Sequence, residues 1–193
     1  MQFVKEVYTK TLEVKQSKFI AYLTPYSKYE ELLHSLQESN PKARHFVVAY
    51  RYLNDFSQVI EHSSDDGEPK GTSGKPSLMV LQGQELINSA VIIVRYFGGT
   101  KLGTGGLVRA YSDAVNDVIN EAKLIKYVKE KTIKIRLNYT DIRMIEYECE
   151  KNSLVINNKV FDDNISCNIK GEEQKIDQFF TKVSRIVELV EDG

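Results

Sequence analysis

Two segments of the chain concentrate residues that can do chemistry. The first, "SSDDGEPKGTSGKPSLMV" at 63–80, contains three carboxylates and two amines, namely Asp65, Asp66, Glu68, Lys70 and Lys75. Neighbouring carboxylates can divide acid and base roles between them, or can hold Mg²⁺ through oxygen ligands. The pairs Asp-Gly and Glu-Pro are equally typical of turns. The residue types therefore leave open a catalytic or metal site, a partner-binding surface and a turn-rich loop.

The second segment, "GGTKLGTGG", contains five glycines, Gly98, Gly99, Gly103, Gly105 and Gly106. The last glycines precede a predicted helix, where exposed N–H groups and the helix dipole favour a phosphate or a carboxylate. Lys101 and Arg109 can add positive charge. The alternative is that the glycines only permit positive φ angles and tight packing.

Neither glycine segment fits a named phosphate-binding motif. A dinucleotide fingerprint that uses Gly103 and Gly105 would need its third glycine at Val108. A Walker A motif ending at Gly74 and Lys75 would need a glycine at Pro69. The sequence therefore disfavours both standard nucleotide folds.

The histidines and cysteines indicate no metal site. His34, His45 and His62 lack ligand spacing, although His45 lies at a strand end near the carboxylates and could titrate functionally. Cys149 and Cys167 alternate or share a helix stripe with isoleucines, which is typical of core residues. We expect neither a metal nor a cofactor.

The first part of the chain alternates strands and helices that would position these segments. We predict strands at 17–24, 45–52, 56–62 and 89–97, the middle two joined as a hairpin by Asn54 and Asp55. Helices are predicted from 29 to about 40, from Pro76 to about Gly83, and after Gly106.

The remainder reads as a separate β-α-β-β-α unit. Strands are predicted at 132–138, 154–161 and 164–170, with one helix after Asp141 and another that carries Ile176 through Ile186. The predicted domains are residues 1–126 and 127–193.

Composition limits the class of protein. With 41% hydrophobic and 27% charged residues the chain should fold as a globular protein. Lys and Arg number 26 against 27 Asp and Glu, so any RNA contact must come from a local patch. The longest aliphatic run, "AVIIV", is too short to cross a membrane, and two cysteines fit a reducing compartment. We expect a cytoplasmic protein without a membrane contact.

The segments "DDGEPKGTSGKPSLMVLQGQ" and "VIIVRYFGGTKLGTGGLVRAY" resemble those of the IMPACT family, and "ARHFVVAYR" corresponds to the family's histidine-containing strand. The resemblance covers the whole chain. It implies an α+β protein whose first domain has the βαββαβα fold of the second domain of a small-subunit ribosomal protein. The second domain would be ferredoxin-like, βαββα, and similar to elongation factor G domains.

The family motif falls on two sets of positions. In this sequence these are Asp65, Asp66, Gly67, Glu68, Pro69, Gly71, Gly74 and Pro76, and then Arg95, Tyr96, Gly98, Gly99, Lys101, Gly103, Gly105, Gly106 and Arg109. Many members have a cysteine where this chain has Val47, so that thiol has no general role. The resemblance implies a link to translation, since the eukaryotic member regulates the response to amino-acid starvation.

The favoured hypothesis is a translation-associated binding protein rather than an enzyme. It would contact the ribosome, RNA or a translation protein through both loops and an exposed sheet of the first domain. The binding residues would be Asp65, Asp66, Glu68, Lys70, Lys75, Arg95, Lys101, Arg109, His45 and the five glycines. The alternative is an enzyme or small-ligand protein that binds a phosphate-bearing ligand, with or without Mg²⁺, at Asp65, Asp66, Glu68 and 98–106. A protein adaptor without RNA affinity is a third hypothesis.

Overall fold

The computed structural model describes residues 1–190, which form two compact units, Met1–Tyr127 and the segment from Val128 onward. Each unit has its own sheet and its own hydrophobic core. Both units combine antiparallel sheets with helices, which confirms the predicted α+β class. Within residues 1–190, no helix has the length and apolar character needed to span a bilayer.

A five-stranded antiparallel sheet forms the centre of the first unit. Its strand order is β2-β3-β6-β4-β5. The strands are β2 (Tyr8–Val14), β3 (Ser17–Pro25), β4 (His45–Leu53), β5 (Val59–Ser64) and β6 (Ser89–Tyr96). A short pair, β1 (Gln2–Phe3) with β7 (Ile125–Lys126), joins the two ends of the unit. The predicted strands and the β4–β5 hairpin are confirmed.

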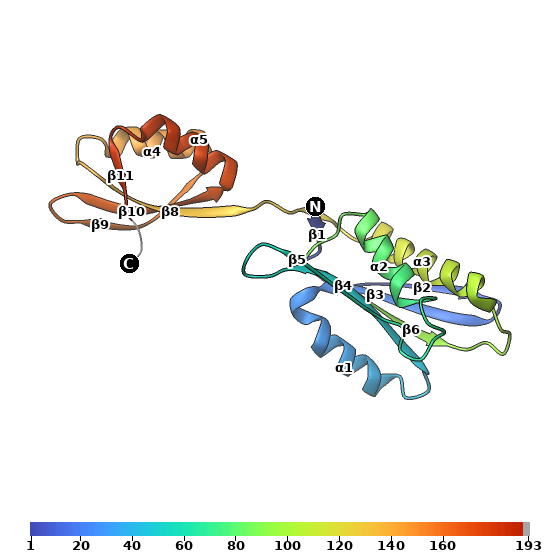
Figure 1. The fold of residues 1–193 in the computed structure, drawn as a ribbon. Coiled ribbons are helices and arrows are strands. Elements are labelled where there is room, and N and C mark those ends of the chain that lie inside the picture. The colour runs from blue at the N-terminus through green and yellow to red at the C-terminus, as the bar shows by residue number, and fades with distance from the viewer. Residues whose placement is uncertain (191–193) are drawn as a thin grey trace. The chain divides into compact units, whose positions relative to one another are not determined.

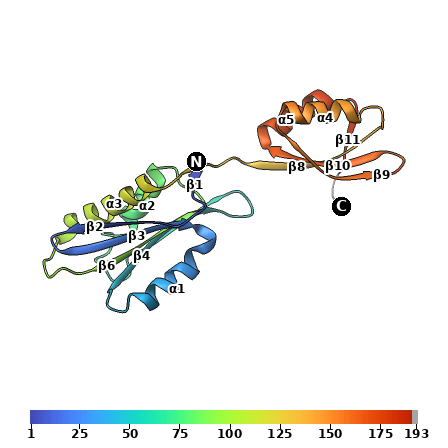
Figure 2. The same cartoon turned by 180° about the vertical axis from the view of Figure 1, so that it is seen from behind.

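Helices cover both faces of this sheet (Figure 1). Helix α1 (Tyr29–Ser39) lies on one face, while α2 (Gly74–Gly83) and α3 (Gly103–Glu121) lie on the other, as the opposite view also shows (Figure 2). The central strand β6 is therefore buried on both faces, as its continuous apolar sequence predicts. The prediction that the first domain has an exposed sheet face is wrong, because α1 packs on one face and α2 with α3 on the other.

The second unit has the βαββαβ order of a ferredoxin-like fold. Its elements are β8 (Glu130–Leu137), α4 (Ile142–Lys151), β9 (Val155–Phe161), β10 (Ile165–Glu172), α5 (Glu173–Val183) and β11 (Val187–Leu189). The strand order is β11-β8-β10-β9, with α4 and α5 on one face (Figure 1). Cys149 and Cys167 are both buried in this core, as predicted.

Several features differ from the sequence prediction, among them the short pair of β1 with β7, which was not expected. Strands β2 and β11 were not expected, so the first unit carries an extra leading strand and the second a closing one. Helix α2 begins at Gly74 rather than Pro76. Helix α3 begins at Gly103, so Gly103, Gly105 and Gly106 form its first turn instead of the preceding loop.

Candidate functional site

Asp65 organises the acidic loop, the segment 65–73 between β5 and α2. Its Oδ1 accepts hydrogen bonds from the Gly74 N–H at 2.8 Å and from the Ser73 hydroxyl at 2.7 Å. Its Oδ2 accepts one from the Gly71 N–H at 2.7 Å. The carboxylate thus binds the loop back on itself and satisfies donors at the start of α2, where an acidic group is favourable.

These donors shift the titration of Asp65. Burial alone raises the pKa of a carboxyl group, because it penalises the charged form. The hydrogen bonds from Gly71, Ser73 and Gly74 outweigh burial here, so the pKa of Asp65 lies below its usual value. Asp65 is therefore a structural anion with its lone pairs already occupied.

Asp66 attaches the same loop to the start of β4. Its Oδ2 accepts a hydrogen bond from the Phe46 N–H at 2.6 Å. Its carbonyl oxygen lies 2.8 Å from Nδ1 of His45, so Nδ1 must carry the proton and donate. This fixes the tautomer of a neutral His45 and leaves Nε2 free toward Glu68, 3.9 Å from its Oε1.

Glu68 is buried and connects three elements. Its Oε1 accepts hydrogen bonds from Nη1 of Arg95 at 2.5 Å and from the Tyr111 hydroxyl at 2.7 Å. Burial, and then the charge of Glu68, raise the pKa of Tyr111 well above its usual range, so this hydroxyl stays a donor. The acidic loop, strand β6 and helix α3 are thus tied together at one carboxylate.

The glycine loop, the segment 97–102 between β6 and α3, rests on the β2–β3 turn. A Cβ on Gly98 would lie 2.0–2.3 Å from backbone atoms of Gln16 and Ser17, so no other residue fits. The Gly98 N–H also donates to the Ser17 hydroxyl at 3.1 Å. Gly98 is therefore required by close approach of the backbone.

The two loops converge on one pocket of about 460 Å³. We call it the cationic pocket, because three permanent cations and one carboxylate line it. Its lining residues are Arg44, His45, Glu68, Pro69, Arg95, Phe97, Lys101, Leu102, Gly103, Thr104 and Leu107. Arg44 and Lys101 are exposed and make no ion pair with any residue in 1–190. The only acid of the lining, Glu68, is neutralised by Arg95.

The structure gathers some of the predicted binding residues and disperses others. His45, Glu68, Arg95, Lys101 and Gly103 line the cationic pocket. The remaining nine do not line it: Asp65, Asp66, Lys70, Lys75, Gly98, Gly99, Gly105, Gly106 and Arg109. Of these, Asp65, Asp66 and Gly98 shape the loops, whereas Lys70, Lys75 and Arg109 are exposed elsewhere on the unit.

The carboxylates of the acidic loop do not form a common ligand set. Asp65 binds its own loop, Asp66 binds Phe46, and Glu68 binds Arg95 and Tyr111. Among residues 1–190 no three His, Cys, Asp or Glu side chains are grouped as a metal site. The Mg²⁺ arrangement in the alternative hypothesis therefore finds no geometric support.

Six lining residues are not among the predicted binding residues: Arg44, Pro69, Phe97, Leu102, Thr104 and Leu107. Arg44 and Phe97 each adjoin a residue that was singled out, His45 and Gly98. Their position next to a strand end could have identified Arg44 and Phe97 from the sequence, since β4 begins at His45 and β6 ends at Tyr96. Residues at such ends are well placed for binding.

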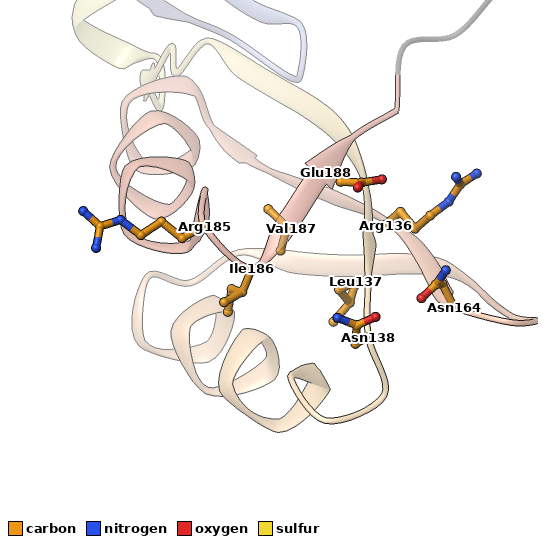
Figure 3. Close-up of a pocket in the computed structure, with 8 residues that line it drawn as sticks. All are labelled: Arg136, Leu137, Asn138, Asn164, Arg185, Ile186, Val187 and Glu188. Atoms are coloured by element: carbon orange, nitrogen blue, oxygen red, sulfur yellow. The ribbon is translucent and has the colours of Figure 1, made fainter.

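A second hollow of about 230 Å³ lies in the second unit, around the ends of β8 and β11 (Figure 3). Its two cations, Arg136 and Arg185, point in opposite directions and away from each other. Arg136 is the cross-strand partner of Glu188, an acid of the same lining. The hollow does not present converging groups, so the cationic pocket is the stronger candidate.

Both loops lie within the part of the chain that matches a family model. Residues 15–119 match the model of the Impact N-terminal domain. The chain belongs to the IMPACT family. An IMPACT family member of Haemophilus influenzae is 33% identical over 190 residues, covering 94% of this chain and 92% of that protein. The family member YigZ of Escherichia coli is 42% identical over 113 residues, covering 56% of this chain and 55% of YigZ.

The fold of the whole chain also has a solved counterpart. A crystal structure described as that of a hypothetical protein superposes with a TM-score of 0.65 at 27% identity. It covers 100% of this chain and 97% of the other. Both units of this IMPACT family member are therefore found together in a solved structure.

Proposed function

We propose that this IMPACT family member is a translation-associated RNA-binding protein of the cytoplasm, which contacts RNA through the cationic pocket. One observation carries the proposal. The two motif-bearing loops meet at one pocket whose exposed cations, Arg44 and Lys101, have no acidic partner in the described chain. Exposed cations without an acidic partner are suited to binding phosphate groups.

The translation context comes from the family. Membership supports it, because the resemblance implies a regulator of translation among eukaryotic members. A binding role is favoured over catalysis because the acidic-loop carboxylates already hold protein donors. Asp65 and Asp66 do not line the pocket, and Glu68, which does, is paired with Arg95.

Binding of purified protein to ribosomes and to structured RNA at low salt tests the proposal. We expect measurable affinity that falls steeply with salt concentration, because phosphate contacts release counterions. The double variant Arg44→Ala with Lys101→Ala should weaken binding and lower the salt slope by about 1 for each lost contact.

A charge-matched control distinguishes RNA binding at this pocket from general electrostatic attraction between RNA and the protein. Lys28 and Lys123 are exposed residues of the same unit outside the pocket, and Lys28→Ala with Lys123→Ala should leave binding nearly unchanged. Equal effects of the two double variants, or no RNA binding at low salt, would overturn the proposal. If the protein captures a ribosomal protein and still does so after nuclease treatment, the adaptor hypothesis would be favoured instead.

A further inference from the structure

We propose that the cationic pocket selects a phosphomonoester, the terminal phosphate of a nucleotide, which is held at the start of helix α3. The inference deepens the proposed function and rests on it for the RNA context. It differs in naming a dianionic chain end or free nucleotide, rather than the phosphodiester backbone, as the group recognised.

The start of α3 is open to an anion. This helix has 19 residues, no side chain caps its N-terminus, and no acid lies in its first turn. Its leading N–H groups therefore lack intrahelical partners and carry partial positive charge. Gly103 and Thr104 of this first turn line the cationic pocket, and a Cβ on Gly103 would meet nothing within 4 Å. In α2, by contrast, Asp65 already occupies the equivalent place.

Arg95 supplies a second, independent indication. It lines the pocket while only 5% exposed, and its Nη1 donates to Glu68. Its Nε is buried without a hydrogen-bond partner. The guanidinium lies near the rings of Phe19 and Phe97, at 5.3 and 5.8 Å from their centroids, which holds it in place. A buried donor without an acceptor is uncommon in a stable protein. An anion bound in the pocket that Arg95 lines would supply the missing acceptor.

The charge of the pocket matches a dianion. Arg95 and Glu68 neutralise each other, which leaves the two unpaired cations, Arg44 and Lys101. His45 faces Glu68 and adds positive charge only when protonated. A phosphomonoester carries about −1.5 to −2 charges at pH 7, whereas a backbone phosphodiester carries about one. The monoester therefore balances the pocket better.

The rest of the pocket indicates what the phosphate is attached to. Its volume of about 460 Å³ exceeds the space of a phosphate group alone. Phe97, Leu102 and Leu107 give it an apolar side, and the Phe97 ring is 47% exposed. Aromatic rings of this kind stack on nucleobases. A nucleoside phosphate thus fits both halves of the pocket.

Titration calorimetry tests this with inorganic phosphate, a nucleoside 5′-monophosphate and the matching nucleoside. We expect the monophosphate to bind at least tenfold more tightly than the nucleoside. The same comparison is then made with RNA oligonucleotides of one sequence that carry a 5′ phosphate, a 3′ phosphate or hydroxyls at both ends. An end phosphate should raise affinity at least fivefold.

Thr104→Asp is the decisive variant. Thr104 is exposed in the first turn of α3, so an aspartate there gives the helix its own anion and should not impair folding. It should abolish the preference for phosphate, whereas the neutral control Thr104→Asn should retain it. If both variants lost the preference for phosphate to the same extent, the inference would be overturned.

The outcomes separate this inference from the proposed function. Equal binding of all three oligonucleotides, with no binding of the monophosphate, would overturn the phosphomonoester site and leave RNA binding standing. Monophosphate binding that Thr104→Asp abolishes, without any RNA binding, would support the site and overturn the RNA proposal. Absence of binding in both arms would overturn both.

Discussion

Glu68 and Arg95 form a buried ion pair that joins two segments 27 residues apart, with Oε1 and Nη1 separated by 2.5 Å. Their side chains are only 3% and 6% exposed. The pair brings the acidic loop to the end of β6 and thereby closes one side of the cationic pocket. Its loss should affect both stability and binding.

Replacing either partner should be strongly destabilising. Glu68→Ala or Arg95→Ala leaves an uncompensated buried charge, for which we expect a loss of about 3–5 kcal/mol in the free energy of unfolding. The double variant should lose less than the sum of the two. Urea denaturation of the four proteins measures this coupling. The exposed pair Lys10 and Glu121 of the same unit is the control, for which we expect little coupling because solvent screens both charges. Strictly additive losses for Glu68 and Arg95 would contradict the prediction.

Asp65 should contribute a pH-dependent part of the stability. Its pKa is lowered in the folded protein, so this contribution is complete above the unfolded-state value of about 3.9 and is lost as pH falls through the folded value. We expect Asp65→Asn to destabilise by about 1–3 kcal/mol at pH 7 and by progressively less below pH 4. Denaturant midpoints across this range measure the difference. A difference between the two proteins that stays constant from pH 7 to pH 3 would contradict this role of Asp65.

Two glycines of the first unit, one in the glycine loop and one at the end of α2, should differ sharply in their tolerance of alanine. Gly98→Ala places a Cβ against the backbone of Gln16 and Ser17, and we expect a loss of about 3 kcal/mol or more. Gly83→Ala meets nothing within 4 Å at the end of α2 and should be neutral or stabilising by up to about 1 kcal/mol. Thermal denaturation distinguishes them. Similar melting temperatures for the two variants would show that the loop moves freely away from the turn.

The two thiols should be unreactive in the folded protein. Burial raises the pKa of Cys149 to about 12 and raises that of Cys167 as well. Because the thiolate is the reactive form, a disulfide reagent at pH 8 should modify them about a hundredfold more slowly than in urea. A cysteine introduced at Val160, which is 51% exposed, should react rapidly under the same conditions. Rapid native modification of Cys149 would contradict this assignment.

The fold was largely predictable because hydrophobic periodicity is strong in most elements. Strand β2 was missed for two reasons. Its outward positions are charged or polar, and the turn at Lys15 and Gln16 adopts positive φ at both residues without the usual glycine or asparagine. Strand β11 has three residues, too few for any period to appear.

The site was only partly predictable for a different reason. Residue types identified the loops, but a carboxylate reads the same in sequence whether it caps a loop, as Asp65 does, or lines a pocket, as Glu68 does. Only the tertiary fold distinguishes them, since Glu68 meets its partners Arg95 and Tyr111 through contacts 27 and 43 residues away along the chain. Local propensity carries no information at that range.

The contact between Gly98 and the β2–β3 turn makes that hairpin a support for one wall of the cationic pocket. Gln16 and Ser17 support Gly98, which lies in the loop segment between the lining residues Phe97 and Lys101. Relatives with a longer or stiffer hairpin turn would therefore have a wider or narrower pocket with unchanged lining residues. Under the proposed function, ligand preference within the family would then diverge through the scaffold alone.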